Sequence, residues 1–223
     1  MKKFMPHFGL IFIMIISICF AGCDNGAPNN ERGETLVCLG DSLTAGYGAS
    51  TPGADDKSKS YPAYLEEKVT IPVINAGVSG DTTEGGLSRV RKDVLSQNPW
   101  IVIIELGAND LPHEQGTEIS LAKLISIISA TRNNLQRIID MVDNGNRKIY
   151  LAKFYTDPVA IAIAARFGLT DGDAQSLITL YDAMYNSLAS SNDIELIEDI
   201  WSGVWGGGGI CRMVYIRMRQ GVE

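Results

Sequence analysis

Five short apolar runs alternate along this chain with stretches in which apolar residues recur at helical spacing. The runs predict strands near residues 35–40, 71–75, 100–106, 148–154 and 194–197. The clearest helical stripe consists of Leu121, Leu124, Ile125, Ile128, Leu135, Ile138, Ile139 and Val142. Asp171 is predicted to cap the helix that follows it. Strands that alternate with helices favour an α/β fold, in which a parallel sheet carries helices on both faces.

A serine follows the first predicted strand directly. The buried run 36–39 gives way to Gly40-Asp41-Ser42-Leu43, which reads as a tight turn at the end of the strand. Ligands of open α/β sheets bind at the carboxyl ends of the strands, so Ser42 is a candidate nucleophile. Asp and Ser after a strand also commonly cap the next helix, and this turn alone does not decide between the two interpretations.

Two further strand ends carry hydrogen-bond donors. Gly80 lies in the loop after the second strand, and Asn109 lies in Gly107-Ala108-Asn109-Asp110 after the third. Because parallel strands end at one edge of a sheet, Ser42, Gly80 and Asn109 are expected to converge. Backbone N–H groups and an amide are the neutral donors that acyl transfer needs around a developing oxyanion. Each residue taken singly also fits an ordinary turn.

Three ordered blocks of this chain resemble the SGNH or GDSL hydrolase family, within its thioesterase, lysophospholipase and arylesterase branch. The resemblance runs from about Thr35 to Trp205, and its blocks are residues 39–47, 75–83 and 105–110. It implies a flavodoxin-like three-layer sandwich with helices on both faces of a parallel sheet. It also implies that Ser42 is the catalytic nucleophile, and that the Ser42 and Gly80 N–H groups and the Asn109 side chain form the oxyanion hole. The implied reaction is cleavage of acyl, aryl, lysophospholipid or thioesters through an acyl-serine intermediate.

The chain departs from the family at the general base. The family carries an Asp-x-x-His-Pro pattern near its C-terminus, whereas the only histidines here are His7 and His113. A serine hydroxyl needs an adjacent base to take its proton. His113 follows Asn109 but stands in a polar loop typical of plain surface, so the general base stays unassigned.

Residues 210–223 show neither helical nor strand periodicity and follow a run of four glycines. If arginine codons of the CGN type are assumed, shifting the reading frame one base upstream allows Asp-Gly-Ile-His-Pro-Asn-Ala-Ala-Gly over this segment. We therefore predict a frameshift between about Gly206 and Ile210, a hydrolase domain over 35–209, an aberrant tail over 210–223, and impaired activity. The alternative is a non-catalytic surface lipoprotein that keeps the fold as an ester- or glycan-binding module.

The N-terminus has the layout of a secretory signal. Two lysines precede an apolar run from Phe8 to Phe20, and small residues then precede Cys23. The segment 1–22 resembles a bacterial lipoprotein signal, which predicts lipidation of Cys23, a flexible tether over 23–34 and a membrane-anchored exported protein. Ordinary signal cleavage and an uncleaved anchor are the alternatives.

Composition bounds the remaining classes of function. The chain has 223 residues, 45% of them hydrophobic, and a net charge of -7. These values fit one enzyme domain and argue against a nucleic-acid partner. Neither metal-ligand spacing of Cys and His nor a phosphate-binding loop is present, so no metal and no cofactor are expected. The expected partners are a small acyl ester, bound by partly apolar loops at 111–116 and 155–169, and a membrane reached through the lipid anchor.

Overall fold

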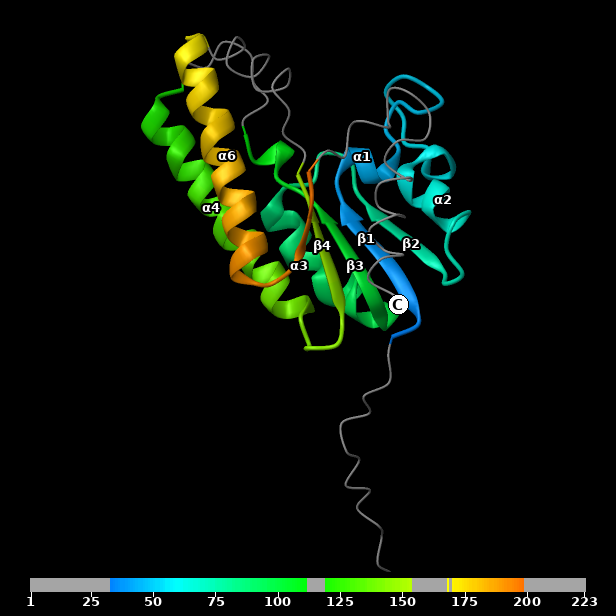
Figure 1. Ribbon diagram of the computed structural model, residues 1–223. Helices are drawn as coiled ribbons and strands as arrows, with labels where there is room; N and C mark the ends of the chain where they lie inside the picture. The colour runs from blue at the N-terminus through cyan, green and yellow to red at the C-terminus, as the bar shows by residue number, and fades with distance from the viewer. Residues whose placement is uncertain (1–32, 112–118, 154–167, 169, 199–223) are drawn as a thin grey trace, which may run out of the picture. The chain divides into compact units, whose positions relative to one another are not determined.

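A five-stranded parallel sheet forms the centre of the protein (Figure 1). The structure is a computed structural model that describes residues 33–111, 119–153, 168 and 170–198. Its strands are β1 Thr35–Gly40, β2 Val73–Gly77, β3 Pro99–Glu105, β4 Lys148–Ala152 and β5 Glu195–Ile197. They are arranged in the order β2-β1-β3-β4-β5, which is the flavodoxin-like order. The predicted α/β class is confirmed, and every predicted strand is present within about two residues of its expected bounds.

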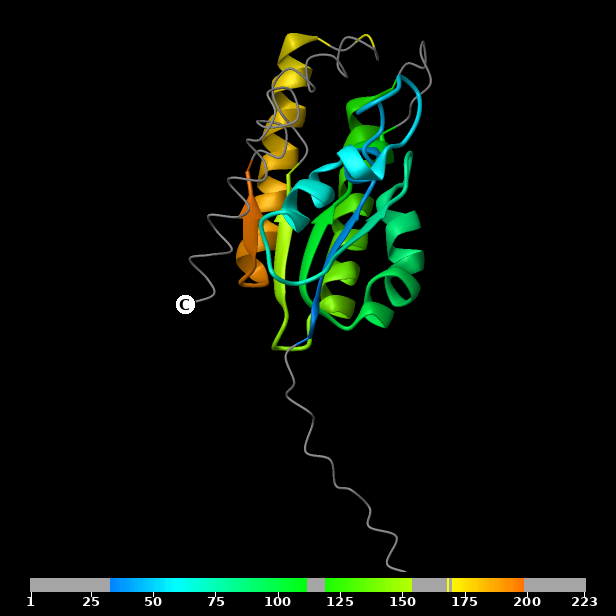
Figure 2. The same ribbon diagram turned by 90° about the vertical axis from the view of Figure 1, so that its right-hand side faces the viewer.

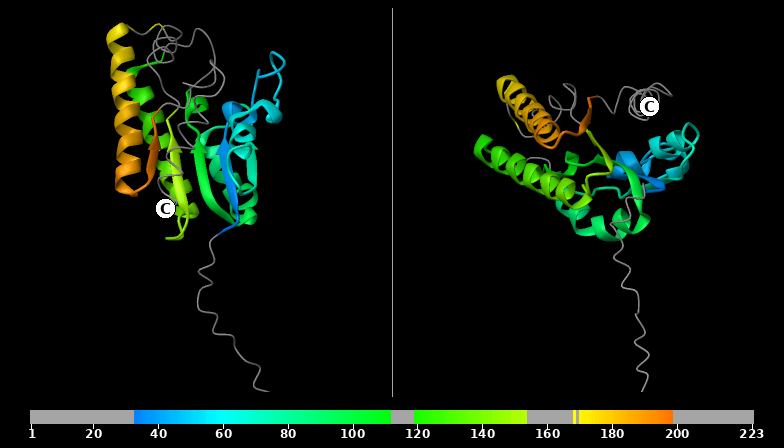
Figure 3. Two further views of the ribbon diagram at one scale, coloured as in Figure 1. Left: turned by 45° about the vertical axis from the view of Figure 1, so that its right-hand side comes forward. Right: turned by 60° about the horizontal axis from the view of Figure 1, so that its bottom comes forward.

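Helices cover both faces of the sheet. The α-helices are α1 Ser42–Ala45, α2 Tyr61–Glu66, α3 Thr83–Asp93, α4 Leu121–Val142 and α6 Asp171–Ser191. The described residues also contain three short 3-10 turns, η1 Lys57–Lys59, η2 Leu95–Gln97 and η3 Ala108–Asp110. Figure 2 shows α2 and α3 on opposite sides of the sheet, and Figure 3 shows α3, α4 and α6 along one side of it. The result is a three-layer sandwich.

The central strand β3 is buried along its whole length, which explains its continuous apolar sequence. Successive side chains of a strand point to opposite faces. Accordingly Val102 and Ile104 join the core beneath α3, α4 and α6. Ile101 and Ile103 join a second core on the other face, together with Cys38 of β1 and with Tyr61 and Leu65 of α2. Burial on both faces fixes the register of β1 and β3, on which the site depends.

The predicted apolar stripe of α4 is correct for six of its eight members. Leu124, Ile128, Leu135, Ile138, Ile139 and Val142 are buried. Leu121 and Ile125, however, are 39% and 45% exposed. Leu121 lies in the first turn of the helix, and at about 100° per residue Ile125 falls roughly a quarter turn from the centre of the buried stripe. That stripe passes instead through Thr131, which is fully buried.

The predicted cap of α6 is wrong by one position. Asp171 is the first helical residue, and Thr170 is the N-cap. The Thr170 hydroxyl accepts the Asp173 N–H at 3.2 Å, and the Asp173 carboxylate accepts the Thr170 N–H at 3.0 Å. This reciprocal pair is a capping box, which satisfies two otherwise unpaired N–H groups. A helix that begins with Thr170 as its N-cap is therefore more stable than one capped by Asp171. No helix in the described ranges has the length and hydropathy needed to cross a bilayer.

Candidate active site

The nucleophile candidate lies at the turn between β1 and α1. Asp41 caps α1 by accepting the Leu43 N–H at 3.0 Å, and Ser42 is the first residue of that helix. The Ser42 side chain also lies close enough to the Asp41 carboxyl to lower its pKa. Ser42 itself is partly exposed. The two interpretations of the turn therefore coexist, because Asp41 serves as the cap while the neighbouring serine stays open to solvent.

Gly40 permits the turn because neighbouring side chains approach its backbone closely. A Cβ on Gly40 would lie 2.8 Å from Glu105 Oε2 and closer still to Thr44 Oγ1. Such contacts lie well inside van der Waals separation, so only glycine fits at the end of β1. The strand register places Gly40 directly beside Glu105.

The loop after β2 is held against the end of β1. The Val78 N–H donates to the Gly40 carbonyl at 3.1 Å, and the Ser79 hydroxyl hydrogen-bonds the Asp55 carboxylate. Gly80 follows with a φ of 79° and no heavy atom within 4 Å of where a Cβ would be. This left-handed conformation favours glycine, and it leaves the backbone at Gly80 exposed at the same sheet edge as Ser42.

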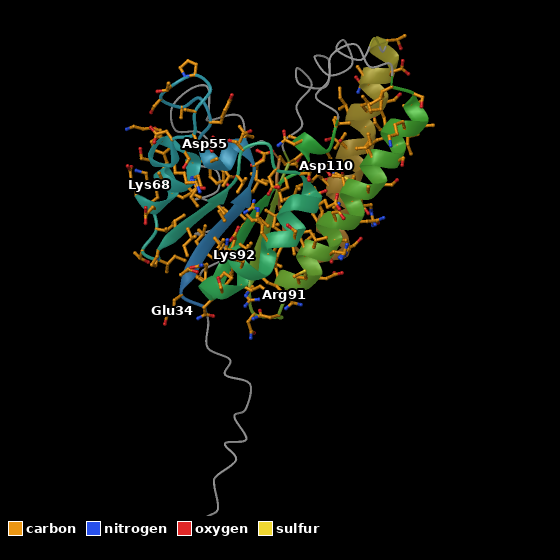
Figure 4. The ribbon with its side chains drawn as sticks, turned by 180° about the vertical axis from the view of Figure 1, so that it is seen from behind. Glu34, Asp55, Lys68, Arg91, Lys92 and Asp110 are labelled. Carbon is orange, nitrogen blue, oxygen red and sulfur yellow. The ribbon has the colours of Figure 1, made fainter. Side chains whose placement is uncertain are left out.

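Asn109 connects the three loops. Its Nδ2 donates to Asp41 Oδ2 at 3.1 Å and to the Asp81 carbonyl at 2.9 Å. Asp41 immediately precedes Ser42, and Asp81 immediately follows Gly80. The structure therefore brings the three predicted residues to one edge of the sheet, with one side-chain amide bridging the neighbours of the other two. Figure 4 shows Asp110, the residue after Asn109, and Asp55 toward this end of the sheet, with Glu34 toward the other.

Arg89 of α3 forms hydrogen bonds to the loops that follow β1 and β2. Its guanidinium donates to the Gly40 carbonyl at 3.0 Å, the Ala76 carbonyl at 2.7 Å and the Asp81 carboxylate at 2.7 Å. A fourth bond, of 3.2 Å, reaches Asp93 one turn along α3. Sequence reasoning missed this residue, since nothing in the helical pattern separates it from the exposed basic residues that follow it on α3 (Figure 4).

Asp110 ties the third loop to the helices. Its carboxylate accepts the Thr83 N–H at 2.9 Å and also bonds the Thr83 hydroxyl. Asn134 of α4 donates to that hydroxyl at 3.1 Å. The first turn of α3, the loop that carries Asn109 and the middle of α4 are therefore held together, which limits how far Asn109 can move.

Two buried acids lie beneath the serine. Burial raises the pKa of Asp41 to about 6, and the Asp81 charge also raises it, whereas the hydrogen bond from the Leu43 N–H and the neighbouring Glu105 and Ser42 side chains lower it. Burial also raises the pKa of Glu105 well above its ordinary value, and the Asp41 charge adds to that effect. Sequence reasoning gave Glu105 no role. The available signal was a carboxylate at the end of an otherwise apolar strand.

Several predicted features lie outside the described residues. These are His113, Cys23, the tail at 210–223 and most of both predicted substrate loops. Within the ranges that the structure describes, no group of three or more His, Cys, Asp and Glu side chains is arranged to hold a metal ion. A cavity of about 700 Å³ lies at the opposite edge of the sheet, where Arg147, Lys148 and Glu195 line it. It is therefore remote from Ser42.

The fold and the site together define a class: parallel α/β proteins with a serine-bearing turn at the point where the strand order reverses, between β1 and β3. Residues 38–209 match the family model described as GDSL-like Lipase/Acylhydrolase. The chain belongs to this family, the SGNH/GDSL esterases.

Individual relatives agree with this family. The chain is similar to an arylesterase of Vibrio mimicus, with 35% identity over 152 residues that cover 64% of this chain and 72% of the relative. It is 33% identical over 132 residues to the thioesterase 1/protease 1/lysophospholipase L1 of Escherichia coli K12, covering 57% of this chain and 56% of that enzyme. The chain thus spans little more than half of the second relative.

A solved structure and a lipoprotein extend the comparison. A mutant of the esterase AlinE4 is 30% identical with a TM-score of 0.53, and the match covers 75% of this chain and 76% of that one. An uncharacterized lipoprotein of Bacillus subtilis, YqeF, is 31% identical over 115 residues, which cover 48% of this chain and 41% of that protein.

Proposed function

We propose that this protein is a serine hydrolase of carboxylic esters in which Ser42 is the nucleophile. The Ser42 and Gly80 N–H groups and the Asn109 amide form its oxyanion hole. The observation that carries the proposal is the pair of Asn109 hydrogen bonds, 3.1 Å to Asp41 and 2.9 Å to the Asp81 carbonyl, which join the neighbours of Ser42 and Gly80. Membership of the GDSL-like family supports the same chemistry.

In the proposed reaction Ser42 Oγ attacks the ester carbonyl carbon and gives its proton to a general base. The carbonyl oxygen becomes an oxyanion, which the three donors stabilise, and the alcohol or thiol leaves with the proton. Water then releases the acid from the acyl-serine by the same steps in reverse. Asn109 must turn one N–H from Asp41 toward the oxyanion, because both of its amide hydrogens are engaged in the free protein.

The general base is the missing part of this machinery. Histidine occurs in the printed sequence only at positions 7 and 113. We propose that a frameshift between about Gly206 and Ile210 replaced the Asp and His of the family pattern, so that the printed chain reacts slowly. The nucleotide sequence tests this directly: codons 212–221 must be able to spell the Asp-x-x-His-Pro block when shifted by one base.

Fluorophosphonate labelling tests the nucleophile. We expect little labelling of the protein with the present sequence and strong labelling of a restored protein that carries an Asp-x-x-His-Pro tail. The restored protein with Ser42→Ala should not be labelled. In the restored protein, Asn109→Ala should slow labelling on the order of 100- to 1000-fold. Asn133→Ala, on the exposed face of α4, is the matched control. Strong labelling of the printed chain would refute the frameshift, and failure of the restored protein to label would favour a non-catalytic ester- or glycan-binding module.

We propose short or medium acyl esters, aryl esters, lysophospholipids and thioesters as the substrate class. The names of the arylesterase and lysophospholipase relatives support this choice. The apolar sequence at 159–164 is consistent with an acyl-binding wall. A panel of esters with one common leaving group and varied acyl chains measures the preference of the restored protein. A preference for acetylated sugars over these esters would contradict it.

We also propose that the protein is an exported lipoprotein anchored through acylated Cys23. The apolar segment that precedes Cys23 and the resemblance to the lipoprotein YqeF support this localisation. Metabolic labelling with an alkyne-tagged fatty acid is expected to mark the wild-type protein but not Cys23→Ser. Labelling of both would assign the lipid to another residue, and labelling of neither would favour ordinary signal cleavage or an uncleaved anchor.

A further inference from the structure

Glu105 is a fully buried acid directly beneath the serine turn. Its Oε2 accepts the Thr44 hydroxyl at 2.9 Å and the Asp41 N–H at 3.4 Å. Its Oε1 is buried and has no hydrogen-bond partner. Leaving an oxygen of a charged carboxylate unpaired in a dry interior is far more costly than leaving an oxygen of a neutral carboxyl unpaired. The geometry therefore favours a protonated Glu105.

Among the residues that the structure describes, no lysine, arginine or histidine forms an ion pair with Glu105. In the described part of the chain, Glu105 interacts electrostatically with three titratable groups: the Asp41 carboxyl after β1, the Tyr61 hydroxyl on α2 and the Tyr185 hydroxyl on α6. The Cys38 thiol of β1 belongs to the same group through Tyr61. Beyond Asp41 lies Asp81, whose partner is Arg89. These described neighbours of Glu105 are acidic or neutral, and two adjacent carboxylates would repel each other there.

We propose that the Asp41 and Glu105 carboxyls hold one proton between them, that Glu105 carries it, and that Glu105 is thereby a positioning residue for Ser42. The inference rests on the proposed role of Ser42. A neutral Glu105 allows Asp41 to remain a carboxylate at neutral pH. That carboxylate accepts a hydrogen bond from Asn109 Nδ2 at 3.1 Å and lies beside the Ser42 side chain, which lowers its pKa. An ionised Glu105 would instead drive a proton onto Asp41, and the neutral Asp41 carboxyl would be a weaker hydrogen-bond acceptor for Asn109.

The directions of the two pKa shifts agree with this assignment. The pKa of Glu105 lies well above its ordinary value, because of burial and then the Asp41 charge. The pKa of Asp41 is raised by burial to about 6, and its interaction with Glu105 acts in the lowering direction. Glu105 is therefore the last of the pair to lose its proton, and Asp41 is ionised at neutral pH.

Carboxyl-carbon NMR titration of the full chain tests the assignment without requiring catalysis. Asp41 is expected to titrate near pH 6, and Glu105 is expected to remain protonated after Asp41 has ionised, because burial and the Asp41 charge both raise its pKa. The Asn109 side-chain amide resonance should move with the Asp41 midpoint, because its Nδ2 bonds that carboxylate. Ionisation of Glu105 at a lower pH than Asp41 would overturn the proposal.

Two variants distinguish a neutral Glu105 from an ionised one by the direction in which they move the titration midpoint of Asp41. Glu105→Gln keeps an uncharged polar group and should leave the Asp41 midpoint unchanged. Glu105→Leu removes the carboxyl whose interaction with Asp41 lowers the Asp41 pKa, and should raise that midpoint. If Glu105 were ionised, both substitutions would remove a negative charge and lower the midpoint. Asp81→Asn should lower it by removing a charge that raises the Asp41 pKa, and so serves as a positive control.

The outcome does not depend on whether Ser42 is reactive. If fluorophosphonate fails to label the restored protein while the titration behaves as expected, the proposed function fails and the shared proton stands. If labelling succeeds but Glu105→Gln lowers the Asp41 midpoint, the function stands and the proton assignment fails. Should Glu105→Leu not fold, the comparison of wild type with Glu105→Gln still decides, because the midpoint either stays or falls.

Discussion

Removal of the Arg89 guanidinium is expected to destabilise the protein and loosen the loop that carries Gly80. The Arg89 side chain is 14% exposed and that of Asp81 is 12% exposed, so Arg89→Met leaves a nearly buried carboxylate without its cation. The Gly40 and Ala76 carbonyls each lose one donor. Breaking a buried pair costs about 3 to 5 kcal/mol. Because both side chains retain some contact with water, we expect a loss near the lower end, about 3 kcal/mol.

Urea unfolding measures this loss. Arg89→Lys should recover only part of it, since an ammonium can bond Asp81 but cannot present the planar fork that reaches two carbonyls as well. Arg91→Met, on the exposed surface of α3, should stay within about 0.5 kcal/mol of wild type. Hydrogen exchange adds a local measurement, because the Val78 N–H that donates to Gly40 should exchange faster in Arg89→Met while Val102 does not.

Equal midpoints for Arg89→Met and Arg91→Met would refute this reasoning. So would a loss below about 1 kcal/mol for Arg89→Met, since that is the size of an exposed pair. Faster exchange at Val102 together with Val78 would show that the substitution weakens the whole sheet rather than the loop.

Three further predictions concern stability. The folded pKa of Asp41 is raised from 3.8 to about 6, so between these values the folded protein keeps a proton that the unfolded chain has released, and stability falls as pH rises. At about 1.36 kcal/mol per pKa unit, the free energy of unfolding falls by about 3 kcal/mol across this pH range. Asp41→Asn should remove this part of the pH dependence in unfolding curves measured over the same range. If the free energy of unfolding of Asp41→Asn fell as steeply with pH as that of wild type, the assignment would be contradicted. In α4, Leu135→Ala should lower the free energy of unfolding in urea by about 2 to 5 kcal/mol and Ile125→Ala by less than about 1 kcal/mol, because only Leu135 is buried. Equal losses for the two variants would contradict the observed stripe. Thr170→Ala should cost about 1 kcal/mol through loss of the α6 cap, whereas no change in the unfolding midpoint would show that the capping box contributes little.

Local sequence accounts for most of the secondary structure. The strand-forming runs are short, apolar and bounded by turn residues, so their positions follow from neighbouring residues alone. The exposure of Ile125 and the capping role of Thr170 were not predictable in this way. The first depends on the angle at which α4 packs against the sheet, and the second depends on a choice between adjacent polar residues that the folded backbone makes.

For the site as well, local patterns in the sequence predicted part of the arrangement and contacts between distant residues determined the rest. Sequence alone placed Ser42, Gly80 and Asn109 at strand ends, because a buried run followed by small polar residues is a local pattern. It also predicted one shared edge, since parallel strands all end there. It could not predict which atoms meet, because Asn109 and Asp41 are 68 residues apart and Arg89 and Gly40 are 49 apart.

The sequence by itself determined the α/β class, the family and the strand that carries each candidate group. Only the tertiary structure decided that Glu105 lies beside Gly40, that its carboxyl is buried against Asp41, and that Arg89 joins the ends of β1 and β2. The physical reason is that strand propensity and turn chemistry act between neighbours in the chain. Burial and pKa are set by strand order and register, which bring distant residues into one low-dielectric environment.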